Sequence, residues 1–181
     1  MLLVTCYLLL RMPDPIAERP NVPGGFDTSL HGTLPWNWAV EKLQTSRDFW
    51  LATVRSDGRP HLAPVWCVWF EDALFFSTDP TSRKGRNLAL NVNCAVSTDG
   101  ANATVIVEGT VSTCDDFELR RRVAELYVAK YEWVLTATET GVALSDGVST
   151  PLYMVQPKTV LGMTDEVTSR MTRWRFVPTP R

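Results

Sequence analysis

A hydroxyl-rich turn joins the end of an apolar strand to the cationic start of a helix. Pro80 cannot donate to a strand ladder, and Thr81 or Ser82 is suited to cap the helix that follows. The first amides of a helix lack partners within it, so together with the helix dipole they attract an anion. Arg83 and Lys84 lie at this same positive end, where cations are unfavourable unless an anion is present. These residue types in this order predict a phosphate-binding site.

Charge alone leaves a second interpretation of this turn open. A capped surface helix with a solvated run of cations, residues 83–86, explains the same residues equally well. The rest of the chain must decide between the two interpretations.

Other kinds of catalytic or metal chemistry lack their motifs in this chain. There is no Gly-x-Ser-x-Gly, no Gly-x-Gly-x-x-Gly, no phosphate-binding P-loop and no His-Glu-x-x-His. The four cysteines are far apart in the sequence, and only His31 and His61 could join them, so no metal site is expected. His61 opens an apolar strand, where a packed and hydrogen-bonded histidine is the usual case.

Length and composition indicate one globular domain. The chain has 181 residues, of which 45% are hydrophobic and 21% charged, and this argues against long disorder. A net charge of -2 provides no global basic field for nucleic acid, so any anion site must be local. Widely spaced cysteines favour a reduced, cytoplasmic protein.

The apolar start of the chain, residues 1–10, is far shorter than the roughly 20 residues that a spanning helix requires. It also lacks the cationic region and the cleavage site of a signal peptide, so neither a membrane segment nor secretion is expected. Met12 is an alternative start that would make the first eleven residues an extension. Intact mass spectrometry showing Met1 retained would exclude this alternative.

Two parts of the chain are expected from the distribution of proline. Residues 1–35 are expected to form an extended arm, because positions 13–35 contain five prolines and three glycines. Residues 36–181 are expected to form the domain, which begins with a short helix. The apolar residues of that helix follow Pro35 with helical spacing: Trp36, Ala39, Val40 and Leu43.

Most of the domain is predicted to be strand. Strands are expected at residues 49–54, 59–70, 73–78, 94–98, 104–112, 152–155 and 159–163. The first three should form a meander, and the second is apolar on both faces. Helices are expected at 82–91 and after a capping box at Asp115 and Glu118, with Arg120 to Arg122 on a solvated face. The polar stretch 136–150 resembles a mobile loop. This order of elements indicates a mainly β fold, a small antiparallel barrel with a few helices.

Five blocks of sequence together resemble the FMN-binding split-barrel superfamily typified by pyridoxamine 5'-phosphate oxidase. The blocks are Trp50-Leu51-Ala52-Thr53-Val54, Asp57-Gly58-Arg59-Pro60-His61, Pro64-Val65-Trp66, Phe76-Ser77-Thr78 and Ser82-Arg83-Lys84-Gly85-Arg86-Asn87-Leu88. Within the superfamily the chain is most similar to the actinobacterial branch of flavin- and deazaflavin-dependent oxidoreductases. The resemblance extends from about residue 36 to residue 176, and the C-terminal Thr172-Arg173-Trp174-Arg175-Phe176 adds to it.

The resemblance implies a homodimer of six-stranded antiparallel split barrels, with two cofactors in grooves between the subunits. Burial of the 59–70 strand on both faces is what such a dimer requires. Motif matching assigns the cofactor phosphate to Ser77, Thr78, Ser82, Arg83 and Lys84. It assigns the ring to Ala52, Thr53 and Val54, with His61, Val65 and Trp66 on the adjacent strand. Arg173 and Trp174 match the segment that the family brings near the ring or the substrate.

Two positions depart from the oxidase that typifies the family. In that enzyme the strand matching residues 61–66 starts with Arg and ends with Lys, both used for the flavin and its phosphate, whereas this chain has His61 and Trp66. Its C-terminal arginines are matched only loosely by Arg173 and Arg175, so the oxidase itself is the third choice. A large Trp66 beside the ring suits a deazaflavin, coenzyme F420, better, and FMN is the alternative cofactor.

The implied activity is hydride transfer from the reduced deazaflavin to a small conjugated organic substrate, with the cofactor supplying the chemistry. Solvent, His61 and Arg173 are the candidates for the proton donor. An FMN-dependent oxidase or reductase is the alternative enzyme. A non-catalytic flavin or tetrapyrrole carrier, or a dimeric barrel with an empty groove, are the alternatives without catalysis. The identity of the substrate depends on the arm and on residues 136–150, which carry no chemical signature.

Overall fold

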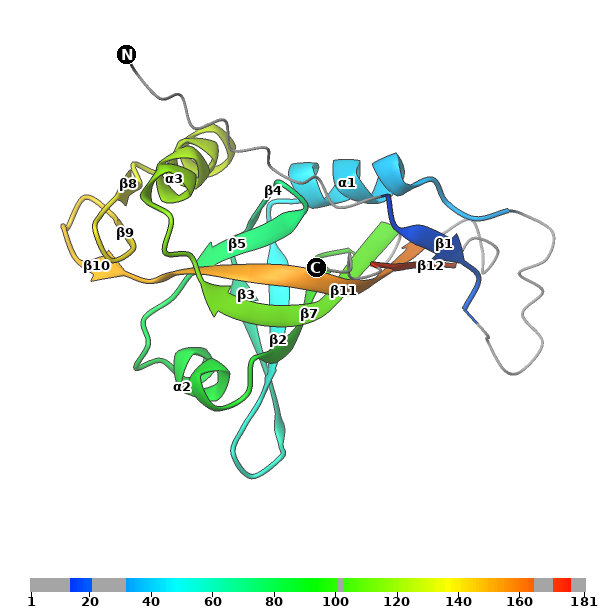
Figure 1. The fold of residues 1–181 in the computed structure, drawn as a ribbon, viewed down its shortest axis with the longest axis horizontal. Coiled ribbons are helices and arrows are strands. Elements are labelled where there is room, and N and C mark those ends of the chain that lie inside the picture. The colour runs from blue at the N-terminus through cyan, green and yellow to red at the C-terminus, as the bar shows by residue number, and fades with distance from the viewer. Residues whose placement is uncertain (1–13, 21–31, 101–102, 165–170, 177–181) are drawn as a thin grey trace, which may run out of the picture.

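The structure, a computed structural model, describes residues 14–20, 32–100, 103–164 and 171–176. The expected N-terminal extension and the alternative start at Met12 lie outside these residues. The chain is arranged around one large antiparallel sheet, with α1 and α3 on one side and α2 on the other (Figure 1).

Nine strands form this sheet within the described residues. They are β1 (Ile16–Glu18), β2 (Phe49–Val54), β3 (Pro60–Val65), β4 (Val68–Phe70), β5 (Ala73–Ser77), β6 (Asn93–Thr98), β7 (Ala103–Thr113), β11 (Leu152–Thr164) and β12 (Thr172–Arg175). The main path runs β1, β12, β11, β7, β6, β2, β3, while β5 joins β11 to β4. The predicted mainly β, antiparallel split-barrel class is confirmed. The sheet has nine strands instead of the six that the resemblance implied, because the short strands β1, β4 and β12 extend it.

The strand β11 connects the two parts of the sheet. It pairs with β7 along its length, while residues 152–155 also pair with β5 and residues 159–162 with β12. The register shifts between Pro157 and Thr159, which accommodates a proline that has no amide hydrogen for the ladder. The two strands predicted around Pro157 are therefore one strand with a bulge.

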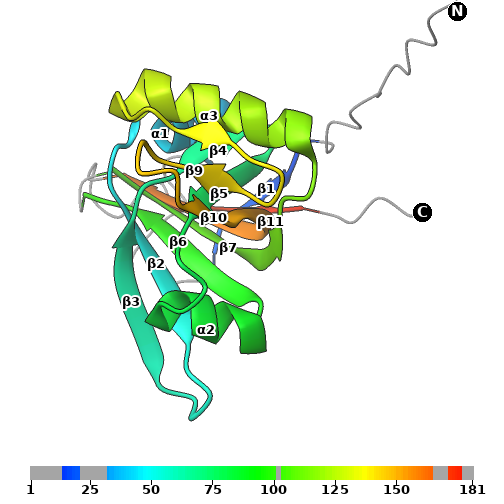
Figure 2. The same ribbon diagram turned by 90° about the vertical axis from the view of Figure 1, so that its left-hand side faces the viewer.

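Three helices are present in the described part of the chain: α1 (Trp36–Thr45), α2 (Arg83–Leu90) and α3 (Phe117–Tyr131). The helix predicted at the start of the domain is confirmed as α1, which buries Ala39 and Leu43 against the barrel. Figure 2 shows a small sheet beside α3, made of β8 (Thr136–Ala137), β9 (Val142–Ala143) and β10 (Ser149–Thr150). The prediction of a loop over 136–150 is wrong in this respect, because its short strands pair with one another.

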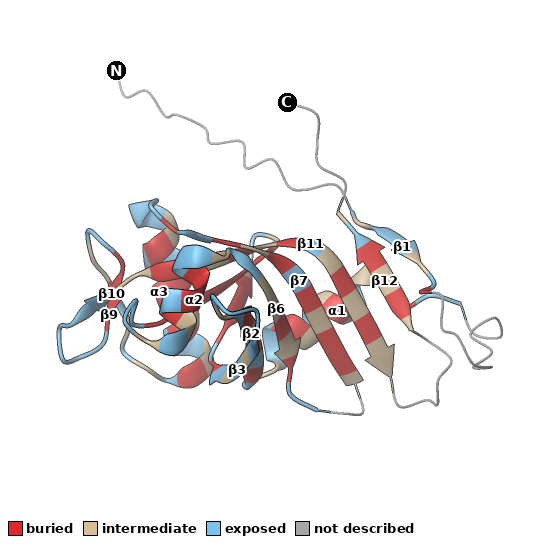
Figure 3. Cartoon of the chain, turned by 90° about the horizontal axis from the view of Figure 1, so that it is seen from below, coloured by how far each residue is buried: buried red, intermediate tan, exposed pale blue. Residues whose placement is uncertain are grey.

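Buried side chains form two clusters, one inside the barrel and one between the sheet and α3. Buried and less buried positions alternate along β7 and β11, as expected for strands with one face on a core (Figure 3). The first cluster includes Phe49, Phe76 and Trp174, and the second includes Phe75 and Val123. Each such side chain contributes about 1.5 to 3 kcal/mol through removal of apolar surface from water.

The strand predicted over residues 59–70 is interrupted at Trp66 and Cys67. Its first part, β3, pairs with β2, and its last part, β4, pairs with β5, so both pairings of the predicted meander are confirmed but its middle strand is two separate strands. Backbone groups at the interruption are satisfied by side chains of α3. Tyr127 donates to the Trp66 carbonyl at 2.6 Å, and Lys130 donates to the Cys67 carbonyl at 2.9 Å. The Tyr131 hydroxyl donates to the Cys67 carbonyl at 2.8 Å and accepts from the Cys67 amide at 3.1 Å.

Burial of this stretch on both faces, predicted from its composition, is not found in the single chain. Leu62 is 60% exposed and Trp66 is 50% exposed. Neither residue belongs to the two core clusters, and β3 is an end strand of the sheet path. The apolar residues of β3 therefore form part of the surface of one subunit.

The start of α3 differs by one residue from the prediction, because Asp116 rather than Asp115 accepts a hydrogen bond from the Leu119 amide, at 2.9 Å. The expectation of three solvated arginines is wrong for Arg120, which is 5% exposed. Arg120 shares the inward face of the helix with Val123, three positions later. Arg121 lies on the outer face, as predicted, and pairs with Glu118 at 2.5 Å.

The ammonium group of Lys130 is expected to make stability depend on pH. Burial, with a smaller contribution from Arg47, lowers the pKa of Lys130 to about 8. Between this value and its ordinary pKa, the unfolded chain binds more protons than the folded chain, so this group makes stability rise with pH. Urea unfolding at pH 7, 8 and 9 should show the wild type gaining stability relative to Lys130→Met. Parallel pH profiles for the two proteins would contradict this expectation.

Candidate functional site

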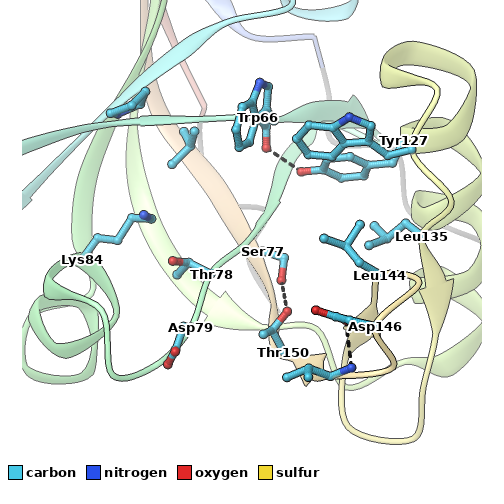
Figure 4. A pocket seen from close by; sticks show the side chains of 14 residues that line it. Trp66, Ser77, Thr78, Asp79, Lys84, Tyr127, Leu135, Leu144, Asp146 and Thr150 are labelled. Atoms are coloured by element: carbon cyan, nitrogen blue, oxygen red, sulfur yellow. Dashed lines mark hydrogen bonds between the residues drawn. The ribbon is translucent and has the colours of Figure 1, made fainter.

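A pocket of about 250 Å³ opens between the strand interruption, the end of β5, the first turn of α2 and the small sheet (Figure 4). Its lining combines hydroxyl, charged, aromatic and aliphatic side chains. The lining residues are Pro64, Val65, Trp66, Ser77, Thr78, Asp79, Lys84, Tyr127, Trp133, Leu135, Leu144, Asp146, Val148 and Thr150. The pocket thus has one polar side and one apolar side.

The polar side is formed where β5 runs into α2. The Ser77 hydroxyl lies 2.6 Å from that of Thr150 and donates to the Pro151 carbonyl at 2.9 Å, which fixes its orientation. The Thr78 hydroxyl lies 3.2 Å from the Ser82 hydroxyl, and Ser82 accepts a hydrogen bond from the Gly85 amide at 3.1 Å. Ser82 is therefore the helix cap, one of the two residues predicted for that position.

The turn before α2 packs directly on the first turn of the helix. Asp79 accepts from the Thr81 amide at 2.7 Å, and this hydrogen bond lowers the pKa of its carboxyl group, which points away from Lys84. A Cβ at Gly85 would lie 2.5 Å from the Asp79 carbonyl oxygen and 2.7 Å from that of Pro80. Only glycine permits this approach. It holds Thr78 and Lys84 on the same side of the pocket.

The charges of three cations act near this polar side. Burial lowers the pKa of His61, and the charges of Arg55, Arg83 and Lys84 lower it further. His61 is therefore neutral near pH 7, with its Nδ1 3.4 Å from the Thr53 hydroxyl. The Nε of Arg55 is buried without a hydrogen-bond partner among the described residues. Carboxylates are also near, because Asp79 and Asp146 line the pocket and the charge of Arg55 acts on Asp57. An anion at the start of α2 would lie beside Lys84 and the free amides of the first helical turn.

The apolar side is built at the C-terminal end of α3. Glu132 adopts a left-handed conformation, φ 62°, which ends the helix and turns the chain toward the pocket. Trp133 then packs edge-on against Trp66, with 4.5 Å between ring centroids. Leu135 and Leu144 extend this wall, as Figure 4 shows. A flat apolar molecule would fit against it.

The structure brings five of the predicted cofactor residues into this pocket: Val65, Trp66, Ser77, Thr78 and Lys84. Ser82 lies just behind them as the helix cap. Arg83 is exposed on α2 and contributes charge without lining the pocket.

The predicted ring residues Ala52, Thr53 and Val54 lie elsewhere, around an outer hollow of about 420 Å³ that is lined by residues of β2, β6, β7 and β11. Thr53 connects this strand to α2, because it accepts a hydrogen bond from Asn87 at 2.9 Å and lies beside His61. The two groups of predicted residues are thus on different surfaces of one chain.

The C-terminal candidates lie at the far end of the sheet from the pocket (Figure 1). Trp174 is fully buried in the barrel core and contacts Trp36, with 5.5 Å between ring centroids, so its ring presents no surface to a ligand in this chain. A Cβ at Gly162 would lie 2.7 Å from the Trp174 ring, which shows how closely the ring is packed. Arg173 lies 3.4 Å from Glu18 in an ion pair across β12 and β1.

Several lining residues were not predicted from the sequence. Tyr127, Trp133, Leu135, Leu144, Asp146, Val148 and Thr150 all come from α3 and the segment after it. Short apolar runs at 133–135 and 142–144 were the available signal, but the polar residues between and after them indicated a loop. Their contribution to the pocket depends on the placement of the small sheet beside α3.

The split-barrel topology defines the class of this protein. The sequence profile of the pyridoxamine 5'-phosphate oxidase family matches residues 39–160, more than half of the chain, and the chain belongs to this family. No curated protein has a matching sequence.

Solved structures agree with this assignment. An F420 reductase is 25% identical, with a TM-score of 0.52, and the match covers 66% of this chain and 93% of that one. The General Stress Protein 26 from Bacillus anthracis is 23% identical, with a TM-score of 0.55 over 70% of this chain and 92% of that one. A heme binding protein from Mycobacterium smegmatis is 16% identical, with a TM-score of 0.59 over 80% of this chain and 60% of that one. The last two share the fold.

Among the described residues, no group of three or more His, Cys, Asp and Glu side chains is placed to hold a metal ion. No helix in the described ranges is long and apolar enough to cross a membrane.

Proposed function

We propose that this protein is an oxidoreductase that binds a deazaflavin, coenzyme F420, or alternatively FMN, and transfers hydride to a small conjugated organic substrate. The observation that carries the proposal is the pocket, in which Lys84, Thr78 and the start of α2 face an aromatic wall. An anionic tail and a flat ring are the two ligand features that such a site recognises.

The residues present fit a flavin-type phosphate. Lys84 forms no ion pair with another described residue, and its charge adds to those of Arg55 and Arg83 at His61. Thr78 and Ser77 supply hydroxyl groups at the same side. When bound, the cofactor would supply the hydride chemistry, and the protein would supply orientation, charge and exclusion of water.

Two observations support the deazaflavin over FMN. Trp66 occupies the position where the family's typical oxidase has a lysine for the flavin, and it forms part of the aromatic wall. A solved F420 reductase is 25% identical to this chain.

The free thiols Cys67, Cys94 and Cys114 support a reducing, cytoplasmic compartment.

Titration of the purified protein with FMN and with coenzyme F420 tests the proposal. If the protein quenches the fluorescence of F420 but not that of FMN, the leading proposal is supported. If it quenches the fluorescence of FMN but not that of F420, the alternative enzyme is favoured. Tight binding without turnover of any electron acceptor would indicate a carrier. Binding of neither cofactor would refute both enzyme proposals.

We also propose a homodimer, because apolar residues are exposed on β2 and β3. Trp50 on β2 is 40% exposed and Leu62 on the adjacent β3 is 60% exposed, while Trp66, just after β3, is 50% exposed. Large apolar side chains exposed together in this way mark interaction surfaces. A partner covering this face would bring its own residues near the outer hollow that contains Ala52 and Val54. The two groups of predicted cofactor residues would then face one another across the interface.

The substitution Leu62→Glu tests this interface. A charge in the centre of an apolar contact is costly to desolvate, so the variant is expected to elute as a monomer where the wild type is a dimer. Light scattering coupled to size exclusion measures the mass. Ile16→Glu, which is also an exposed apolar position but lies on β1 at the other end of the sheet path, is the control and should stay dimeric. A monomeric wild type would refute the proposed dimer.

A further inference from the structure

We infer that Tyr127 is a positioning residue for the ligand pocket: its hydroxyl group fixes the Trp66 backbone and thereby the aromatic wall against which a bound ring lies. The inference rests on the proposed function. It goes beyond that proposal because Tyr127, on α3, lies outside the five sequence blocks, between residues 50 and 88, that carry the family resemblance.

The hydrogen bonds of Tyr127 connect the two chain segments that form the pocket. Its hydroxyl donates to the Trp66 carbonyl at 2.6 Å and lies 3.0 Å from the Phe75 carbonyl, so one hydrogen is shared between two acceptors. Trp66 carries the aromatic side of the pocket, and Ser77, two residues after Phe75, begins its polar side. A single hydroxyl group therefore sets the distance between the two sides.

The hydroxyl group remains a donor throughout the ordinary pH range. Tyr127 is 4% exposed, and its burial raises the pKa of the phenol well above its usual value. The ring is packed within the cluster between the sheet and α3, and its centroid lies 5.4 Å from that of Tyr131. Removal of the oxygen alone would leave this packing in place.

The position of the Trp66 ring depends on how the backbone of Trp66 is held. Trp66 lies at the strand interruption, outside both β3 and β4, and half of its side chain is exposed. Its ring contact is with Trp133, which α3 itself places through the left-handed turn at Glu132. α3 thus positions both rings of the wall. It holds Trp66 through the Tyr127 hydrogen bond, and it places Trp133 through the turn at Glu132.

The test compares Tyr127→Phe with Val123→Ala, a variant on the same inward face of α3 that does not line the pocket. Both variants should lose stability. Tyr127→Phe is expected to raise the dissociation constant of coenzyme F420, or of FMN if that is the cofactor bound, by about tenfold, whereas Val123→Ala should bind as the wild type does. Wild-type affinity in Tyr127→Phe, or an equal loss in both variants, would overturn the inference.

A second measurement needs no ligand. The emission of Trp66, isolated in each background by subtracting the spectrum of the corresponding Trp66→Phe variant, is quenched by acrylamide in proportion to its accessibility. Tyr127→Phe should raise this quenching and Val123→Ala should not, and equal quenching would overturn the inference. If the wild type binds neither cofactor, the proposed function fails, while this comparison still decides whether Tyr127 positions Trp66.

Discussion

The substitution Lys84→Ala is expected to weaken cofactor binding about tenfold or more, since charge-assisted hydrogen bonds contribute roughly 1.5 to 3 kcal/mol. Lys84 is the cation that lines the pocket, and it has no carboxylate partner among the described residues. Its loss would leave Thr78, Ser77 and the helix start to hold the anion. Fluorescence titration with coenzyme F420 and with FMN measures the change.

The structure distinguishes Lys84 from Arg83, although the sequence gives the two equal roles. Arg83 is exposed and acts from outside the lining, where solvent and salt screen its charge. Arg83→Ala should therefore have a smaller effect than Lys84→Ala, and the difference should persist when salt is raised. Lys42→Ala on α1 removes the same charge far from the pocket and serves as the control. Equal affinities for wild type and Lys84→Ala would remove the phosphate site from this position.

The start of α2 could be predicted from sequence because its signals are local. A proline, a hydroxyl cap and two cations lie within residues 80–84, and the hydrogen bonds of the cap connect residues only three or four positions apart. Ser82 and Gly85 illustrate this, since cap and capped amide belong to one helical turn. The same applies to the β2 strand and to the amphipathic α1.

The strand interruption at Trp66 and Cys67 could not be predicted in this way. Residues 59–70 are apolar on both faces, as a single buried strand can be, and no proline or glycine marks a break after Val65. What stabilises the break is Tyr127, Lys130 and Tyr131, about sixty positions later in the chain. Long-range hydrogen bonds of this kind override the local pattern.

The burial of Trp174 has the same explanation. Its sequence neighbours, Arg173 and Arg175, indicate an exposed segment, and the resemblance suggested a position near a ligand. Antiparallel pairing of β12 with β11 instead turns alternate residues inward, which places Trp174 beside Gly162 in the core and leaves Arg173 with Glu18. The alternation of residue types over 172–176 is visible in the sequence. Which of the alternate side chains face the core depends on how β12 pairs with β11.

The substitution Gly85→Ala is expected to destabilise the protein, against the trend of helix propensity. Alanine in the interior of a helix is favoured over glycine by about 1 kcal/mol. At this position, however, the added Cβ would lie 2.5 Å from the Asp79 carbonyl oxygen and 2.7 Å from that of Pro80. Both are backbone atoms, so the turn must move, at a cost of about 1 to 3 kcal/mol for overpacking.

Movement of this turn should also reduce binding, because Thr78 precedes it and Ser82 follows it. The hydroxyl groups of these two residues are 3.2 Å apart, and a shift of the turn would separate them and displace Lys84. We expect a loss of cofactor affinity of about tenfold, since small displacements of positioned groups have large effects. The amide of residue 85 remains available to Ser82 in Gly85→Ala, so the effect is that of the methyl group alone.

Ala89→Gly, at an exposed position of the same helix, measures how much stability α2 loses when glycine replaces alanine without a change in packing. Thermal and urea unfolding of both variants separate the two contributions. If packing of the turn against Gly85 is as close as the structure shows, both substitutions lower stability, although they exchange the same two residue types in opposite directions. A higher melting temperature for Gly85→Ala would mean that the turn yields freely. The close approach would then have no part in holding Thr78 and Lys84 on one side of the pocket.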